Sequence, residues 1–253
     1  MLTHSMTIYA LPLSLTGDTE RAVRIFIWSG ETSKNKTIIV AWNNICKSIN
    51  EGGLGMRSIF KLNEASNLKL AWDTLNFDEN RVVVLRERVT RNNKFITYYV
   101  FSSIWSNAKL ELHKVLNNSS CCLRNGQSII LWYNNWRGSP LFLDGDALTS
   151  IVDHLINIIL VNGVWDFSKS STTIPISIQV CIRNHHIPFD IRLDKRCWNL
   201  CSNGDLPFKF SYDFKCYRGN FKESWRWIWN KSIPQSKSFM VWRILHNKLP
   251  IDK

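Results

Sequence analysis

The most regular pattern of apolar and polar positions lies between residues 42 and 75, and it predicts two amphipathic helices joined by a glycine-rich corner. Apolar side chains recur there at the i, i+3, i+4, i+7 spacing of one helical face. They are Trp42, Ile45, Cys46 and Ile49 in the first helix and Ala65, Leu68, Ala71, Trp72 and Leu75 in the second. Gly52, Gly53 and Gly55 interrupt the pattern, because glycine turns the chain through positive φ without steric cost. We expect an architectural corner that carries no chemistry.

Similar periodicity predicts further helices over residues 18–28, 81–91, 102–116 and 174–183. Two Asn-Gly turns, at 125–126 and 203–204, lie between short β-prone segments and predict two antiparallel hairpins. Pro207 should restrict the second hairpin to a sheet edge. The expected fold class is α+β, mostly helical with two short antiparallel β-hairpins. A chain of 253 residues, 45% hydrophobic, is long enough for one large or two small domains.

Positive charge is concentrated in two blocks of the chain. The net charge is +12. Residues 81–124 hold eight basic and two acidic side chains, and residues 181–253 hold fourteen and six. This balance favours a polyanionic partner such as RNA or an RNA–DNA duplex. The alternative is a basic surface that is only solvated and binds no partner. The candidate nucleic-acid-binding residues are Arg86, Arg88, Arg91, Lys94, Arg226, Lys231, Lys237 and Arg243.

The C-terminal aromatic residues allow two interpretations. Trp225 and Trp229 share a helix face, and Trp227 lies on the other side. An exposed tryptophan there would stack on a base. The interpretation that we favour is that Trp225 and Trp229 pack with Phe239 and Trp242 as core.

No metal site, cofactor or catalytic residue is predicted. Seven cysteines in no regular framework indicate reduced thiols. Cys197 and Cys201 are the only plausible zinc pair, and core thiols are the better interpretation. The close acidic pair Asp144 and Asp146 has the features of a solvated turn. The Tyr-x-Asp-Asp signature of a polymerase palm, a nucleophile motif and a Walker lysine are all absent, so we expect no small-molecule substrate.

The sequence shows no targeting or membrane signal. The N-terminal residues lack a basic n-region, and the longest apolar run, near 155–161, is too short to cross a bilayer. We therefore expect a nuclear or cytoplasmic protein without a membrane partner.

Several motifs resemble plant non-LTR (LINE-type) retrotransposon polyproteins downstream of the polymerase core. In the corner these are Trp42-x-x-Ile45-Cys46, the run Glu51–Arg57 and Asn63-Glu64-Ala65. Tyr9–Pro12 with Phe26–Gly30 is similar to the thumb segment that follows the palm. Trp225-x-x-Ile228-Trp229, Pro234-x-x-Lys237, Phe239-x-x-Trp242-Arg243 and Leu249-Pro250 resemble the opening of the reverse transcriptase zinc-binding domain. The chain departs from the family at Asn134, where the family has an aspartate.

The resemblance implies three segments: a thumb-like helical segment (1–80), a connector with two hairpins (81–215) and a truncated start of the reverse transcriptase zinc-binding domain (216–253). In the family the zinc ligands follow the Leu-Pro, so the resemblance implies that this chain ends before them. It implies a fragment of an RNA-directed DNA polymerase polyprotein that is not catalytic by itself and binds nucleic acid non-specifically at most. A domesticated protein–protein interaction module and a nuclease or polymerase accessory, such as a ribonuclease H-like protein, stay open as alternatives.

Overall fold

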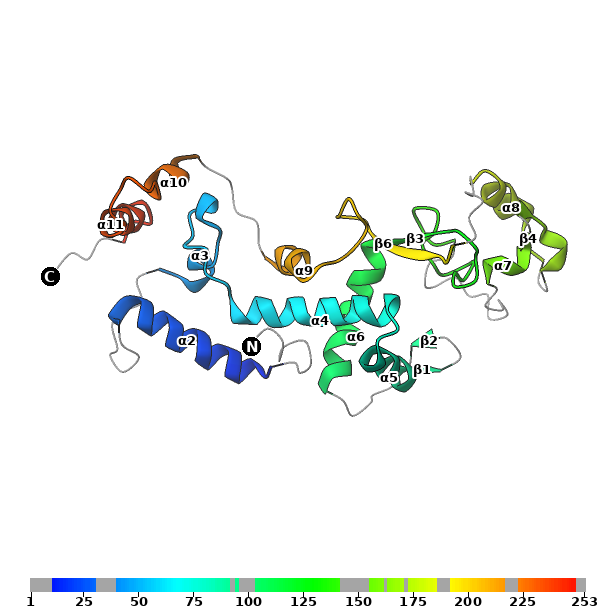
Figure 1. Cartoon of the computed structure of the whole chain (residues 1–253), viewed down its shortest axis with the longest axis horizontal. Coiled ribbons are helices and arrows are strands. Elements are labelled where there is room, and N and C mark those ends of the chain that lie inside the picture. Colours follow the sequence, from blue (N-terminus) through cyan, green and yellow to red (C-terminus); the bar gives the residue numbers. More distant parts are fainter. Residues whose placement is uncertain are drawn as a thin grey trace. The chain divides into compact units, whose positions relative to one another are not determined.

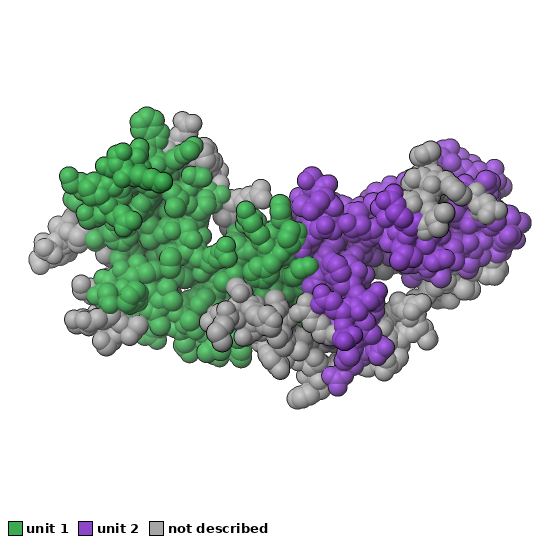
Figure 2. Space-filling view, viewed as in Figure 1, with its two compact units in different colours: residues 1–70, 101–107, 207–253 green, residues 71–100, 108–206 purple. Residues whose placement is uncertain are grey.

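The chain forms two compact units, shown in different colours in Figure 2. Unit 1 comprises residues 1–70, 101–107 and 207–253, and unit 2 comprises residues 71–100 and 108–206. The computed structural model describes residues 11–30, 40–91, 94–95, 103–141, 155–161, 163–170, 173–185, 192–216 and 223–248. The three segments predicted from the sequence, with boundaries at residues 80 and 215, are each continuous in the chain. Each compact unit instead combines segments that are far apart in sequence.

Unit 1 is built from helices (Figure 1). They are α2 (Leu13–Ser29), α3 (Trp42–Ile45), the 3₁₀ turn η1 (Ile49–Glu51), the part of α4 (Ile59–Asn76) up to residue 70, the first residues of α6 (Ser103–Asn117), α9 (Phe208–Lys215), α10 (Glu223–Ile228) and α11 (Gln235–Leu245). The helices expected over 18–28 and 65–75 are confirmed as parts of α2 and α4.

A buried carboxylate joins α2 to the beginning of α4. Glu20 is only 8% exposed and accepts hydrogen bonds from Ser58 Oγ at 2.6 Å and from the Phe60 backbone N–H at 3.0 Å. Ser58 also caps α4, since its Oγ accepts from the Lys61 N–H at 3.2 Å. The negative charge therefore lies at the positive end of the helix dipole, where it is stabilised.

The glycine corner between α3 and α4 is confirmed, but its three glycines serve two purposes. Gly52 and Gly55 have φ of 85° and 68°, the left-handed region that glycine tolerates. Gly53 is needed for a different reason, because a Cβ there would lie 2.0 Å from the Lys47 carbonyl oxygen. The expected first helix is shorter than predicted: α3 ends at Ile45, and a turn leads into η1.

The C-terminal helices pack on this corner. The indole N–H of Trp242 donates to the Gly52 carbonyl oxygen at 2.8 Å, and Nε2 of His246 lies 2.9 Å from the same oxygen. Trp242 is fully buried, and Trp225, Trp229 and Phe239 pack against the same core cluster. The interpretation of these aromatic residues as core is confirmed.

The described residues of unit 2 form short helices and three two-stranded antiparallel sheets. Its elements are the remainder of α4, α5 (Asn80–Val89), β1 (Thr90–Arg91), β2 (Lys94–Phe95), most of α6, β3 (Ser119–Cys122), α7 (Ile156–Ile159), β4 (Leu160–Val161), β5 (Val164–Trp165), the 3₁₀ turn η2 (Phe167–Lys169), α8 (Ile176–Arg183) and β6 (Lys195–Trp198). Its core cluster is aliphatic and aromatic and includes Leu131, Trp132, Trp136, Ile156 and Ile182.

The fold class, α+β and mostly helical with short antiparallel strands, is confirmed, but both hairpins are wrong in their placement. β3 pairs with β6, with Ser119 opposite Trp198 and Cys122 opposite Lys195, so the first Asn-Gly turn closes no hairpin. After the second turn the chain forms α9 where a strand was expected. Pro207 directly precedes that helix, a place where its fixed φ and missing N–H cost nothing.

Among the described residues, no helix combines the length and apolar character that a membrane crossing requires.

Candidate nucleic-acid interface

Three of the predicted cationic residues lie exposed on the C-terminal helices of unit 1. Arg226 belongs to α10, Lys231 to the following turn and Lys237 to the first turns of α11. None of them forms an ion pair with a residue that the structure describes. Their charges are therefore available to a polyanion.

Trp227 lies on the outer face of α10 between these cations in sequence. Its side chain is 75% exposed. Trp225 and Trp229 are only partly exposed and face the core, and the Trp225 ring stacks on His246 with centroids 5.4 Å apart. Since residues two apart on a helix point to opposite sides, burying 225 and 229 leaves 227 outside. In proteins that bind single-stranded nucleic acids, exposed aromatic side chains stack on unpaired bases.

Arg243 does not belong to this exposed group. It is half-buried on α11, and its Nε is buried without a hydrogen-bond partner among the described residues. Its guanidinium therefore contributes to the edge of the unit 1 core as well as to the charge of α11.

The other predicted cations belong to unit 2, and Arg86 has a structural role there. Its Nε donates to the Thr74 carbonyl oxygen at 2.8 Å, and Nη1 donates to the Asp78 carboxylate at 2.7 Å. Nη2 donates to the Phe77 carbonyl oxygen. The guanidinium thus satisfies carbonyl groups at the C-terminal end of α4, where cations are favoured.

The remaining predicted cations of unit 2 are Arg88, Arg91 and Lys94. Arg88 is exposed near the end of α5. Arg91 and Lys94 occupy opposite positions of the β1–β2 ladder. The structure thus divides the eight predicted residues between two units, and the three exposed on α10, α11 and the turn between them accompany the 75% exposed ring of Trp227.

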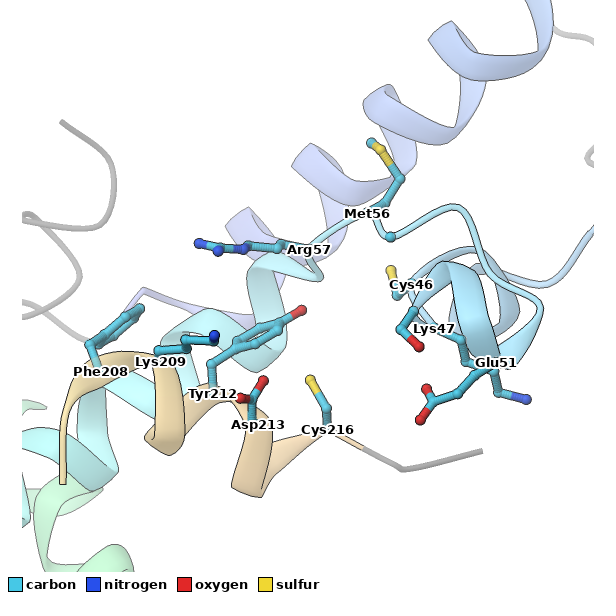
Figure 3. A pocket seen from close by; sticks show the side chains of 12 residues that line it. Cys46, Lys47, Glu51, Met56, Arg57, Phe208, Lys209, Tyr212, Asp213 and Cys216 are labelled. Atoms are coloured by element: carbon cyan, nitrogen blue, oxygen red, sulfur yellow. The ribbon is translucent and has the colours of Figure 1, made fainter. Parts of the chain in front are cut away.

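Sequence reasoning missed a second feature of unit 1, a pocket of about 500 Å³ (Figure 3). Lys47 and Arg57 from the corner and Lys209 from α9 contribute cations to its lining, and Glu51 and Asp213 contribute carboxylates. No signal could have revealed it, because the corner and α9 are separated by about 150 residues of chain.

The phenol and thiols of this pocket are held protonated. The Tyr212 hydroxyl accepts a hydrogen bond from the Ser58 N–H at 3.2 Å, and the Arg57 guanidinium lies 5.8 Å from the ring centroid. Burial, together with the hydrogen bond to Cys216, raises the pKa of Tyr212. Burial also raises the pKa of Cys46 to about 12. At neutral pH these groups act as hydrogen-bond donors and not as nucleophiles.

The candidate zinc thiols are not brought together. Cys201 lies in the turn after β6, and its thiol donates to Asn203 Oδ1 at 2.9 Å. Cys197 instead lies against Cys122, with the two sulfurs 3.2 Å apart. Among the described residues, no three His, Cys, Asp or Glu side chains converge as metal ligands would. Asp144 and Asp146 lie outside the described residues.

Asn134, where the resembling family has aspartate, closes a turn. Its Oδ1 accepts from the Ile130 N–H at 2.7 Å, and its own N–H donates to the Ile130 carbonyl oxygen at 3.2 Å. An amide oxygen performs this role as a carboxylate would, so the substitution preserves the local structure.

Comparison with known proteins identifies a distant plant relative. The chain is 23% identical, over 263 aligned residues, to an Arabidopsis thaliana protein named "Putative ribonuclease H protein". The alignment covers 96% of this chain and 42% of that protein, so the chain spans less than half the length of its relative. No family model and no solved structure matches. The similarity supports a loose, retroelement-related kinship.

Proposed function

We propose that unit 1 binds RNA without sequence preference through α10 and α11. The observation that carries this proposal is the 75% exposure of Trp227 within a helical pair that also exposes Arg226, Lys231 and Lys237. The cations neutralise phosphates and release counterions, which favours binding to any sequence. The indole stacks on an unpaired base, which is equally tolerant because every base has a π-face.

Replacing the exposed indole tests this proposal. Trp227→Ala should weaken the binding of single-stranded RNA by roughly 5- to 150-fold, the range that follows from about 1–3 kcal/mol of stacking energy per base. Because the ring is exposed, the thermal unfolding midpoint should change little. Fluorescence anisotropy with a labelled oligonucleotide measures the affinity.

Phe26→Ala is the matched control, because Phe26 is a 56% exposed aromatic residue on α2 of the same unit. It should leave the affinity unchanged. Equal affinity of the Trp227→Ala variant and the parent protein would refute the stacking role.

At the level of the whole protein, we propose that the chain is a segment of a LINE-type reverse transcriptase polyprotein, from the thumb to the start of the zinc-binding domain. The motifs of the corner and of α10–α11, and the relationship to a plant protein of more than twice this length, support this proposal. In such a protein the segment would hold template RNA while a separate palm performs synthesis. The reading frame around the gene tests it, since palm codons upstream and Cys/His codons downstream, intact or decayed, are expected.

The name of the Arabidopsis relative favours a second candidate, ribonuclease H-like hydrolysis. That chemistry requires several carboxylates that together hold divalent metal ions, and the described residues supply no such cluster. Mg²⁺-dependent cleavage of the RNA strand of an RNA–DNA hybrid by the purified chain would favour this candidate over a binding role.

The outer face of α11 favours a third candidate, a protein–protein interaction module. Met240, Val241, Ile244 and Leu245 are 41–58% exposed on this helix. Such a module would bind a protein partner and show no salt-dependent affinity for RNA, so an RNA titration at two salt concentrations separates it from the first proposal.

A further inference from the structure

Two cysteine thiols from distant parts of the sequence meet on the β3–β6 ladder of unit 2. The sulfurs of Cys122 and Cys197 are 3.2 Å apart, although 75 residues separate them in the chain. Cys122 lies opposite Lys195, and Cys197 lies two residues further along the same strand. Since alternate strand residues share a face, both thiols lie on one face of the ladder. A disulfide has an S–S distance of about 2.05 Å, so bonding requires an approach of roughly 1 Å.

The residues around the pair leave Cys122 accessible to solvent and restrict the position of the Cys197 sulfur. Cys122 is exposed and Cys197 is half-buried. A Cβ on Gly204 would lie 3.0 Å from the Cys197 sulfur, so a larger residue there would displace the thiol. On the other side, Cys122 leads into a loop whose Arg124 and Gly126 N–H groups donate to the carboxylate of Asp194, the residue before β6. Neighbouring backbone on both sides of the pair therefore restricts where the two sulfurs can lie.

We propose that Cys122 and Cys197 are a redox modification site that forms a reversible disulfide by exchange with a low-molecular-weight disulfide such as oxidised glutathione. The exposed Cys122, as thiolate, attacks one glutathione sulfur, which breaks the glutathione S–S bond and releases one glutathione thiolate. Cys197 then loses its proton to solvent and attacks the Cys122 sulfur, and the second glutathione leaves. Two protein thiols are oxidised, and one glutathione disulfide is reduced to two thiols.

The second step should be the slower one at neutral pH. Burial, together with the hydrogen bond to Cys122, raises the pKa of Cys197 to about 11. Only the thiolate is the attacking species, so resolution of the mixed disulfide accelerates as the pH rises toward that value. A glutathione adduct on Cys122 should therefore accumulate at pH 7 and convert to the protein disulfide at pH 9.

The bond would lock β3 to β6. Closing a loop of this length restricts the unfolded chain, so the thermal unfolding midpoint should rise by roughly 5–10 °C. This consequence is independent of the proposed RNA binding, because the two strands belong to unit 2.

The test uses the full chain, without denaturant, incubated with excess oxidised glutathione at pH 7 and pH 9. Peptide mapping by mass spectrometry under non-reducing conditions should find a link between the peptides that contain Cys122 and Cys197. Dithiothreitol should reverse both the link and the rise in midpoint. Cys181→Ser, which removes an exposed thiol of α8, should retain the link.

Cys122→Ser and Cys197→Ser should each abolish the link. Persistence of the link in Cys122→Ser would mean that the neighbouring Cys121 forms it and would overturn the proposal. No link at pH 9 in the parent chain, a link to another cysteine, or a link without a rise in midpoint would overturn it as well.

Discussion

The corner of unit 1 can form because Gly53 has no Cβ. A Cβ there would lie 2.0 Å from the Lys47 carbonyl oxygen and 2.4 Å from the carbonyl carbon. Both are backbone atoms, so a change of side-chain rotamer cannot relieve the overlap. We predict that Gly53→Ala destabilises the protein by about 2–4 kcal/mol, because the corner must open to relieve the overlap. Urea unfolding followed by tryptophan fluorescence measures this.

The control is Gly17→Ala, at an exposed position within α2 where an added Cβ meets nothing within 4 Å. Alanine is the better helix former, so this variant should gain about 0.5–1 kcal/mol. If the two substitutions changed stability in the same direction, the steric account of the corner would be wrong.

Asp194 holds the loop after β3 through its carboxylate. Oδ1 accepts from the N–H groups of Arg124 and Gly126 at 2.8 and 3.0 Å, and Oδ2 accepts from the N–H and Oγ of Ser128 at 3.0 and 3.1 Å. Asp194→Asn keeps one acceptor and turns an NH₂ group toward the Ser128 N–H. We predict a loss of about 1–3 kcal/mol in the free energy of unfolding.

Asp205→Asn provides the comparison, because Asp205 is exposed and forms a surface ion pair with Lys195 at 2.9 Å. Such pairs contribute little, about 0–1 kcal/mol. Denaturant titrations of both variants should therefore rank Asp194 clearly above Asp205. The reverse order would refute the role of the Asp194 carboxylate in holding the loop.

At the scale of elements, several helices were predictable, whereas α9 and the strand pairings were not. Helical periodicity is a local property, so α2, α4, α6 and α8 follow from spacing alone. The turn at residues 125–126 has hairpin chemistry, yet the Gly126 N–H donates to the side chain of Asp194, 68 residues away, and β3 pairs with β6. Non-local partners of this kind leave no signal in a single sequence.

The attachment of α11 to the corner gives a prediction at the same scale. Trp242→Phe removes the N–H that donates to Gly52 while retaining an aromatic ring, and it leaves the buried carbonyl with one partner fewer. It should cost about 1–2 kcal/mol in the free energy of unfolding, measured by urea titration.

Trp229→Phe is matched to it, because the Trp229 N–H is buried without a hydrogen-bond partner among the described residues. Removing an unpaired N–H relieves a desolvation penalty, so this variant should be neutral or slightly stabilised. Equal losses in both variants would show that ring volume, and not the hydrogen bond to the corner, attaches α11.

At the scale of the molecule, half-buried thiols make the protein sensitive to alkali. Their unperturbed pKa is 9.0, and burial raises the pKa of Cys46 to about 12 and that of Cys197 to about 11. Above pH 9 the unfolded chain releases protons that the folded chain retains, so stability falls as the pH rises. We predict that the urea midpoint decreases steadily from pH 9 to pH 11 and is flat between pH 7 and pH 8.5. Cys46→Ala should reduce the slope, whereas an unchanged slope would exclude Cys46 as a source.

The sequence predicted the basic character of the whole molecule and the residues that carry it, because charge is additive along a chain. It could not predict which cations are engaged internally, as Arg86 is, or which tryptophan is left outside. It also gave no indication of the pocket beside α9. These features depend on contacts between segments that only folding brings together.

The salt dependence of RNA binding tests the central claim most directly. With three exposed cations contacting phosphates, the slope of log K against log salt concentration for a single-stranded RNA should be about −2. The slope should be the same for adenine and uracil oligonucleotides, titrated by anisotropy between 50 and 200 mM KCl. A slope near zero, or binding of only one of the two sequences, would contradict sequence-tolerant electrostatic binding by α10 and α11.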